Sequence, residues 1–277
     1  MSAKGENPAS FVKHEAIERL ARGQVARARL FLNAGDHVAI IDMHAGDGRG
    51  VVQPEPDLFR GDESTATPIL ATGIGEALRR DGYRCDVLLC EKNRDRRSLL
   101  TPLAERGAQI LGNHATLPPL DYRWALVFND PNGHGAHGDD VLRRVAQEVP
   151  KADFLIVVNE ASLSRHIGVN PEQEPGSFAA NVAASATKHA WRLAPPEWAR
   201  LLGRRQVIVS KSTYGRNAMK GRILLVSNAP QRTPRGYSLV SLFNRGGQSG
   251  SAPPESSSGA SRGRDRGHPK LPFAAGF

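Results

Sequence analysis

The 277-residue chain contains only two cysteines, few aromatic residues and no long uninterrupted apolar stretch. Cys85 and Cys90 lie five residues apart in an apolar run, so they supply neither a structural zinc site nor a disulfide framework. Charged residues occur throughout the first forty positions, which argues against a signal peptide or a membrane-spanning helix there. We therefore expect a cytoplasmic protein that uses no metal and no membrane.

The charge balance is strongly basic. Lysine and arginine number 37 against 28 acidic residues, which gives a formal net charge of +9 and a pI of about 10.0. Each Lys or Arg placed against a phosphate releases condensed counterions, so a basic surface favours polyanionic partners. The expected partner is a nucleic acid, either DNA or RNA.

Composition divides the chain into three parts. Residues 244–277 are dominated by Gly, Ser, Pro and Arg and have too little apolar surface to offset the entropy of ordering, so we expect a disordered basic tail. Residues 1–35 are expected to form an N-terminal helical extension, with an amphipathic helix over Val12 to Phe31. Residues 36–243 are expected to form the folded domain.

Within residues 36–243, short apolar runs alternate with amphipathic helical patterns, which is typical of a parallel α/β sheet. The expected strands are Val38 to Asp42, Asp86 to Cys90, Gln109 to Leu111, Ala125 to Asn129, Phe154 to Val158, Gln206 to Val209 and Ile223 to Ser227. The expected helices are Pro68 to Arg80, Arg94 to Arg106, Asp139 to Glu148 and Pro196 to Leu202. The last two strands are joined by a hairpin loop, Ser212 to Gly221, rather than a helix. The pattern predicts a Rossmann-like α/β fold with a mostly parallel seven-stranded sheet that ends in an antiparallel hairpin.

The first expected strand ends in a glycine turn that contains Asp42, Gly46 and Gly48. Glycines at the carboxyl end of a strand let a ligand approach the backbone closely. A nicotinamide dinucleotide site needs a third glycine three residues later and an acid about 20 residues on. Here Val51 occupies that third position, and the acid at the next strand end, Glu91, is 45 residues beyond Gly46 (91 − 46). Asp42 suits the ammonium group of an amino-acid-bearing nucleoside better.

Polar residues also follow the next two expected strands. A carboxylate at Glu91 can accept both hydroxyls of a ribose, although a surface acid paired with nearby basic residues is the alternative. Asn113 follows the third strand, where it can contact an adenine amine. Together with Asp42 and the two glycines, these residues favour S-adenosylmethionine as the cofactor.

The fourth expected strand ends in Asn129, Asp130 and Pro131. Methylation of an exocyclic base amine needs an acceptor for the NH₂ protons beside a rigid main-chain turn, so that the nitrogen lone pair faces the methyl group. Asn129 or Asp130 supplies the acceptor and Pro131 the rigid turn. The local residues alone are also those of an ordinary Asx-Pro turn.

With these residues in view, the chain resembles class I S-adenosylmethionine-dependent methyltransferases, and most specifically the bacterial three-Cys-motif partner family, over about residues 36–228. Asp42-Met-His-Ala-Gly46-Asp-Gly48 is similar to that family's Asp-Leu-Phe-Ala-Gly-Pro-Gly, and Glu91-Lys92-Asn93 to its Glu-Lys-Asp. Thr67-Pro68-Ile-Leu-Ala resembles its Ser-Pro-Leu helix start, and Phe128-Asn-Asp130-Pro131-Asn-Gly133 its Phe-Leu-Asp-Pro-Phe-Gly.

The chain departs from the family pattern at three motif positions: His44, Asp47 and Asn132. The residue after Asp-Pro is normally an aromatic that stacks on an extruded base, so stacking here would come from Tyr122, Trp124 or Tyr214. The resemblance implies methylation of an exocyclic base amine in DNA or RNA, adenine rather than cytosine. The alternatives are a methyltransferase for a small molecule or a protein, and a non-catalytic nucleic-acid-binding protein on the same fold.

Overall fold

The computed structural model describes residues 8–48, 66–131, 138–159, 190–209 and 221–228. Its centre is a seven-stranded sheet in the order β3-β2-β1-β4-β5-β7-β6. The strands are β1 (His37–Asp42), β2 (Arg84–Cys90), β3 (Ala108–Leu111), β4 (Trp124–Asn129), β5 (Asp153–Asn159), β6 (Gln206–Val209) and β7 (Gly221–Ser227). The first five pair in parallel, and β7 pairs antiparallel with both β5 and β6. The predicted fold class is thereby confirmed, including the terminal antiparallel hairpin.

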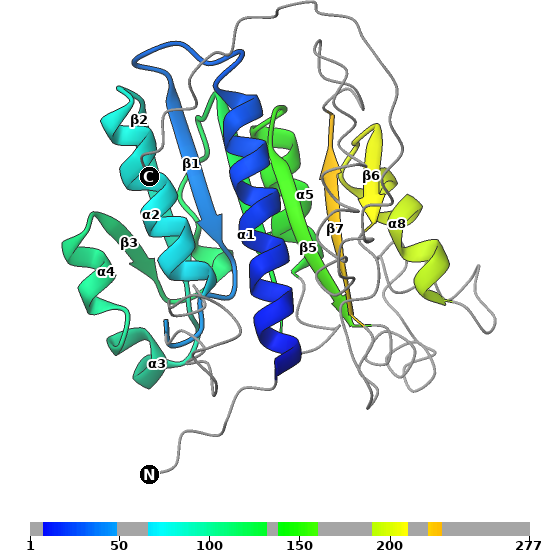
Figure 1. Ribbon diagram of the computed structural model, residues 1–277, viewed down its shortest axis with the longest axis horizontal. Helices are drawn as coiled ribbons and strands as arrows, with labels where there is room; N and C mark the ends of the chain where they lie inside the picture. The colour runs from blue at the N-terminus through cyan, green and yellow to red at the C-terminus, as the bar shows by residue number, and fades with distance from the viewer. Residues whose placement is uncertain (1–7, 49–65, 132–137, 160–189, 210–220, 229–277) are drawn as a thin grey trace, which may run out of the picture. The chain divides into compact units, whose positions relative to one another are not determined.

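Helices cover both faces of this sheet (Figure 1). They are α1 (Pro8–Ala28), α2 (Thr67–Arg80), α3 (Arg94–Ser98), α4 (Thr101–Glu105), α5 (Asp139–Glu148) and α8 (Ala190–Leu201), with a 3-10 turn, η1, over His114–Thr116. One apolar core joins α1, α2 and α4 to one side of the sheet. A second core joins α5 and α8 to the other side. Successive residues of each buried strand contribute to opposite cores, as the pleat requires.

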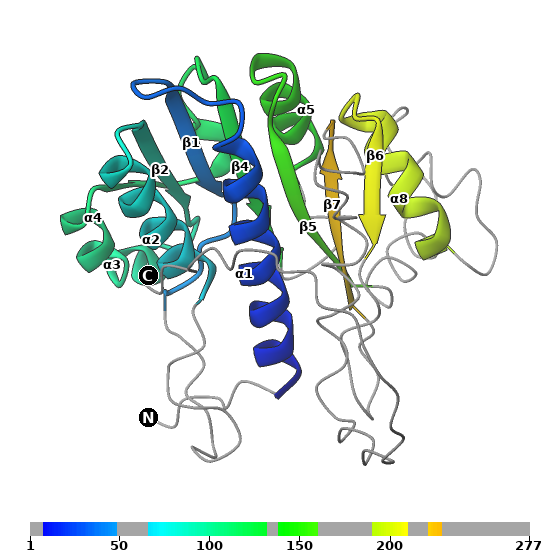
Figure 2. The same ribbon diagram turned by 45° about the horizontal axis from the view of Figure 1, so that its top comes forward.

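The strand order reverses direction between β1 and β4, which are neighbours although β2 and β3 lie between them in the sequence. Figure 2 shows β4 between β1 and β5. In open α/β sheets, ligands bind beyond the carboxyl ends of strands at such a switch point. The topology therefore places the ends of β1, β2, β3 and β4, where the candidate residues lie, on one edge of the sheet.

Helix α1 is part of the main packing and not an isolated arm. Apolar side chains along it, Ile17, Leu20, Ala21, Val25 and Ala28, are buried in the first core. Near its end, Arg27 forms an ion pair with Asp153 at the start of β5, which also accepts hydrogen bonds from the Trp124 indole (2.8 Å) and the Ser227 hydroxyl. Burial of the Asp153 carboxylate is costly unless such partners satisfy it, so this network fixes the C-terminal end of α1 against β4, β5 and β7.

Several element boundaries differ from the prediction. The single helix predicted over Arg94 to Arg106 is two short helices, α3 and α4. Pro102 lies in the first turn of α4, where proline is tolerated, whereas inside a continuous helix it would remove a hydrogen bond. α1 starts four residues before Val12, and α8 starts before Pro196 and contains both Pro195 and Pro196.

Some predicted features fall outside the described residues: the basic tail (244–277), the hairpin loop between β6 and β7 (210–220) with Tyr214, and Val51 after the glycine turn. In the part of the chain that is described, no helix has the length and hydrophobicity needed to cross a membrane.

Candidate functional site

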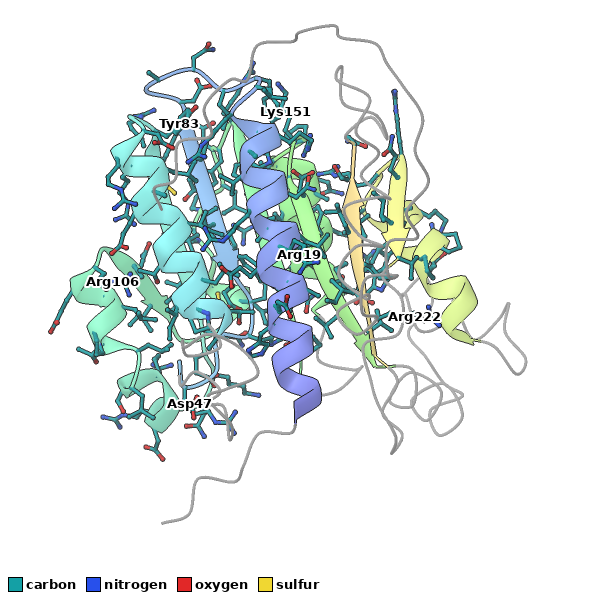
Figure 3. All side chains as sticks on the ribbon, in the orientation of Figure 1. Arg19, Asp47, Tyr83, Arg106, Lys151 and Arg222 are labelled. Atoms are coloured by element: carbon teal, nitrogen blue, oxygen red, sulfur yellow. The ribbon has the colours of Figure 1, made fainter. Side chains whose placement is uncertain are left out.

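A cavity of about 770 Å³ opens at the carboxyl ends of the parallel strands. This volume is within the range of ligand pockets. It is lined by His14, Met43, His44, Ala45, Gly46, Asp47, Gly48, Ala66, Thr67, Pro68, Cys90, Glu91, Lys92, Arg96, Asn113, His114 and Asp130. Figure 3 shows Asp47 at this edge of the sheet and Tyr83 and Lys151 at the opposite edge.

The loop after β1 forms the floor of the cavity. Its backbone continues to pair with both neighbouring strands: the Met43 N–H donates to the Phe128 carbonyl (3.0 Å) and the Ala45 N–H to the Cys90 carbonyl (2.9 Å). The chain then turns through Gly46 and Gly48, whose φ angles of 66° and 70° lie in the left-handed region. Only glycine adopts this conformation without strain. A Cβ on Gly48 would lie 2.9 Å from Leu100 Cδ2, whereas a Cβ on Gly46 would meet nothing within 4 Å.

Asp42 lies beneath this floor and does not line the cavity itself. It is 1% exposed, and its Oδ1 accepts the His44 backbone N–H at 3.0 Å. Its Oδ2 is buried and has no hydrogen-bond partner among the described residues. Burial raises the pKa of Asp42 to about 7, partly offset by the Thr67 hydroxyl and the His44 amide; the nearby Asp130 and Glu91 raise it further. A buried carboxylate oxygen without a donor needs a ligand or a water to satisfy it.

This raised pKa gives an expected pH dependence of folding. An ordinary Asp loses its proton near pH 3.8, so above that pH the unfolded chain binds fewer protons at this position than the folded chain does. The Asp42 contribution to the free energy of unfolding is therefore greatest at low pH and is lost as pH rises through about 7. We expect the Tm of Asp42→Asn minus that of the unsubstituted protein to increase from about pH 5 to about pH 8.

The comparison between these two proteins isolates Asp42 from other groups. His14 and His44, whose pKa values burial lowers to about 4, destabilise the fold as pH falls below 6.5, but both proteins retain them. Thermal unfolding monitored by circular dichroism at several pH values measures the difference. A Tm difference that does not vary with pH would contradict the assignment.

Glu91 and Asn113 lie in the cavity wall, at the ends of β2 and β3. Glu91 is 9% exposed, and its Oε1 accepts the Asn93 N–H at 2.6 Å, which fixes the carboxylate beside the cavity. The Asn113 side chain caps the 3-10 turn η1 by accepting the Ala115 N–H at 3.2 Å. The structure therefore gathers Asp42, Gly46, Gly48, Glu91 and Asn113 around one cavity, from three adjacent strand ends.

The three residues predicted at the end of β4 have different placements. Asp130 lines the cavity, but Asn129 and Pro131 do not. Asn129 is fully buried and its side chain lies beside His44. Of the three residues, Asp130 is thus the one whose side chain reaches the cavity.

Several residues at this site were not predicted from the sequence as site residues, among them Lys13, His14, His44 and His114. Lys13 Nζ lies 2.5 Å from Asp130 Oδ2, and His14 lines the cavity. The rings of His44 and His114 lie edge to face, 5.4 Å apart. Burial lowers the pKa of both imidazoles, and that of His44 falls to about 4, so both rings are neutral near pH 7.

Two of the three expected stacking residues, Tyr122 and Trp124, are not at the site, and the third, Tyr214, lies outside the described residues. Trp124 is fully buried and donates its indole N–H to Asp153, and Tyr122 donates its hydroxyl to Asp86 at 2.9 Å. Both lie near the start of β4, at the opposite edge from the cavity, because the loop before β4 ends there. Ring surface in the cavity comes from histidine instead.

Within the described ranges, no group of three or more His, Cys, Asp or Glu side chains is arranged to hold a metal ion. His134 and His137 of the loop after β4 lie outside those ranges.

No family model and no curated protein sequence matches the chain. Similar solved structures include the plantazolicin methyltransferase BpumL in complex with SAH, with 11% identity over 79% of this chain and 86% of that chain and a TM-score of 0.45. Protein LPL1258 from Legionella pneumophila has 14% identity over 88% of this chain and 92% of its own, with a TM-score of 0.49. A fibrillarin/Nop5p complex has 11% identity over 71% and 74%, with a TM-score of 0.39. At these TM-scores, the function has to be inferred from the residues of the site itself.

Proposed function

We propose that this chain is an S-adenosylmethionine-dependent methyltransferase that acts on an exocyclic base amine in DNA or RNA, adenine rather than cytosine. The observation that carries the proposal is the convergence of polar residues from four neighbouring strand ends on one cavity. Asp42 is the last residue of β1 and lies beneath the cavity floor, whereas Glu91, which follows β2, Asn113, which follows β3, and Asp130, which follows β4, line the cavity.

The residues present fit the cofactor. The unpartnered Oδ2 of Asp42 suits the methionine ammonium group, held directly or through a water. Glu91 suits the ribose hydroxyls and Asn113 the adenine, while Gly46, where a Cβ would meet nothing within 4 Å, leaves the floor open to close approach. When bound, S-adenosylmethionine supplies an electrophilic methyl group.

The glycine turn provides a matched pair of variants. Gly46 and Gly35 both have positive φ angles, 66° and 85°, and a Cβ on either meets nothing within 4 Å. Alanine at either position costs about 1 kcal/mol of strain, but only Gly46 lines the cavity. We expect both variants to lower the Tm similarly, while Gly46→Ala alone raises the Kd for S-adenosylmethionine by roughly tenfold or more, because its methyl group occupies cofactor space. Equal affinities in calorimetric titrations of the two variants would contradict this placement of the cofactor.

We call the part of the cavity around Asp130 the acceptor end, because the amine that accepts the methyl group would bind there. It contains Asp130 and two neutral histidine rings. A carboxylate oxygen can accept a hydrogen bond from an N–H of the amine, and the rings of His44 and His114 offer flat surfaces beside it. Catalysis would come from alignment and electrostatics. A covalent cysteine route is disfavoured because burial raises the pKa of both Cys85 and Cys90 to about 12.

The proposed nucleic-acid partner is supported by charge. Lys92 and Arg96 lie in the cavity wall, and Arg94 and Arg97 are close by on α3. These cations lie where a phosphate backbone would pass if a base entered the cavity. Both cysteines are free thiols, which agrees with a cytoplasmic protein.

The test begins with calorimetric titration of the full chain with S-adenosylmethionine. Incubation with the tritiated cofactor and a mixture of DNA, RNA and protein follows, at two salt concentrations. We expect micromolar binding, label in DNA or RNA, and substrate binding that weakens steeply with salt. Label in protein or a small molecule would overturn the substrate class, and no binding at millimolar cofactor would overturn the methyltransferase.

A further inference from the structure

Helix α1 reaches the acceptor end of the cavity through Lys13, although Lys13 and Asp130 are 117 residues apart in the sequence. Its first turns lie beside the carboxyl ends of the parallel strands, as Figure 1 shows. Lys13 Nζ contacts Asp130 Oδ2 at 2.5 Å, and the two side chains are only 17% and 18% exposed. A charged hydrogen bond at this depth is screened less by water than a surface ion pair.

The Lys13–Asp130 ion pair changes the net charge next to the substrate group that would accept the methyl. Lys13 balances the Asp130 carboxylate, and it engages one of the two carboxylate oxygens. The adjacent His14 is kept neutral, because burial and the Lys13 charge lower its pKa to about 4 although Asp130 raises it. His44 is neutral as well. This end of the cavity therefore holds a balanced ion pair and uncharged rings, with no excess negative charge from these four residues.

We propose that Lys13 is a positioning residue that also determines specificity: it holds Asp130 in place and neutralises it, so that the acceptor is an uncharged, planar nitrogen and not an alkylammonium group. This inference rests on the proposed function and narrows it. A neutral aromatic amine donates an N–H to the carboxylate oxygen that Lys13 leaves available. At Asp130, an alkylammonium group meets the repulsion of the Lys13 cation, and the Asp130 carboxylate is already compensated by that cation.

The test compares Lys13→Met, which removes the charge and keeps an unbranched side chain, with Lys13→Arg, which restores the charge. Arg19→Met is the control, because Arg19 is on the same helix, 40% exposed and paired with Glu15 (Figure 3). We expect Lys13→Met to lower methyl transfer to a base amine about 30-fold or more, with the Kd for S-adenosylmethionine within about threefold. Lys13→Arg should recover most of the loss, and Arg19→Met should show none.

The preference between two competing methyl acceptors is a measurement that a purely structural role of Lys13 would leave unchanged. With a base-containing oligonucleotide and a lysine-containing peptide as competing acceptors, Lys13→Met should shift the ratio of incorporated label toward the peptide by about tenfold. An unchanged ratio together with unchanged turnover would overturn the proposal. So would an equal loss of turnover in Lys13→Met and Lys13→Arg with an unchanged ratio.

A cofactor-free measurement separates this inference from the proposed function. Thermal unfolding of Lys13→Met, Asp130→Asn and the double variant forms a double-mutant cycle. We expect the double variant to lower the Tm by less than the sum of the two single losses, since each single variant leaves a partly buried group without its partner. Additive losses would overturn the Lys13–Asp130 pairing. If Lys13 and Asp130 are coupled but the protein transfers no methyl group, the proposed function is rejected. Lys13 then has only a structural role, and the specificity claim is overturned as well.

Discussion

Asp42→Asn is expected to raise the Kd for S-adenosylmethionine about 30-fold or more while raising the Tm of the cofactor-free protein near neutral pH. Both effects follow from the same oxygen. The asparagine side chain retains an Oδ1 that can accept the His44 N–H, so the floor of the cavity keeps its hydrogen bond. Replacement of the unpartnered Oδ2 by an amide nitrogen removes a buried negative charge, which stabilises the free protein and removes the partner of the cofactor ammonium.

The opposite signs of the two effects distinguish a binding role from a structural one. Calorimetric titration gives the Kd and thermal unfolding gives the Tm, both near pH 7. Asp86→Asn is the matched control, because Asp86 lies on the neighbouring strand β2 and pairs with Tyr122 and His37, away from the cavity. It should leave the Kd unchanged. An Asp42→Asn variant that binds the cofactor normally would contradict the proposed role.

The sheet was predictable because its strands are nearly continuous apolar runs, and the central strands are buried on both faces. All seven expected strands are present, and the extent of β6 agrees at both ends. Some of the strands that were predicted too short gain polar residues at an end, such as Arg84 of β2 and Asp153 of β5, whereas β3 and β4 gain Ala108 and Trp124. Backbone hydrogen bonds to a neighbouring strand extend a strand into residues of any polarity, and hydrophobic periodicity in the sequence does not show these hydrogen bonds.

The cofactor side of the site was predictable for a related reason. Asp42, Glu91 and Asn113 each come directly after or close to a strand end, and parallel strands bring their carboxyl ends to one edge. Local sequence order was therefore enough to gather them. The placement of Asn129 was not predictable in this way, because alternate residues at a strand end point to opposite sides.

The acceptor side depends on contacts that no local pattern encodes. Lys13 and His14 lie on a helix whose sequence indicates only an amphipathic surface element, and their approach to Asp130 depends on how α1 crosses the sheet. That crossing is set by the buried face around Ile17 and by the Arg27–Asp153 ion pair near the other end of the helix. Only tertiary packing brings residues 13 and 130 together.

Asp130→Ala is expected to lower methyl transfer by about 10²- to 10⁴-fold while the protein still binds S-adenosylmethionine. Of the three residues predicted at the end of β4, Asp130 is the one that lines the cavity, so it is placed to accept a hydrogen bond from an N–H of the amine. Single-turnover transfer from the tritiated cofactor to an oligonucleotide measures the loss, and calorimetry measures the Kd. Full turnover in this variant would remove Asp130 from the proposed mechanism.

The Kd of Asp130→Ala has its own expected change. Without Asp130, the Lys13 ammonium loses its partner at a position only 17% exposed, and its charge repels the sulfonium of the cofactor. We expect a Kd that is a few-fold higher, and we expect Lys13→Met combined with Asp130→Asn to restore it, since that double variant is neutral at both positions. Turnover should stay low in the double variant. Recovery of affinity without recovery of turnover would separate the two consequences of losing Asp130: the charge left on Lys13 weakens cofactor binding, and the missing carboxylate leaves the acceptor nitrogen unaligned.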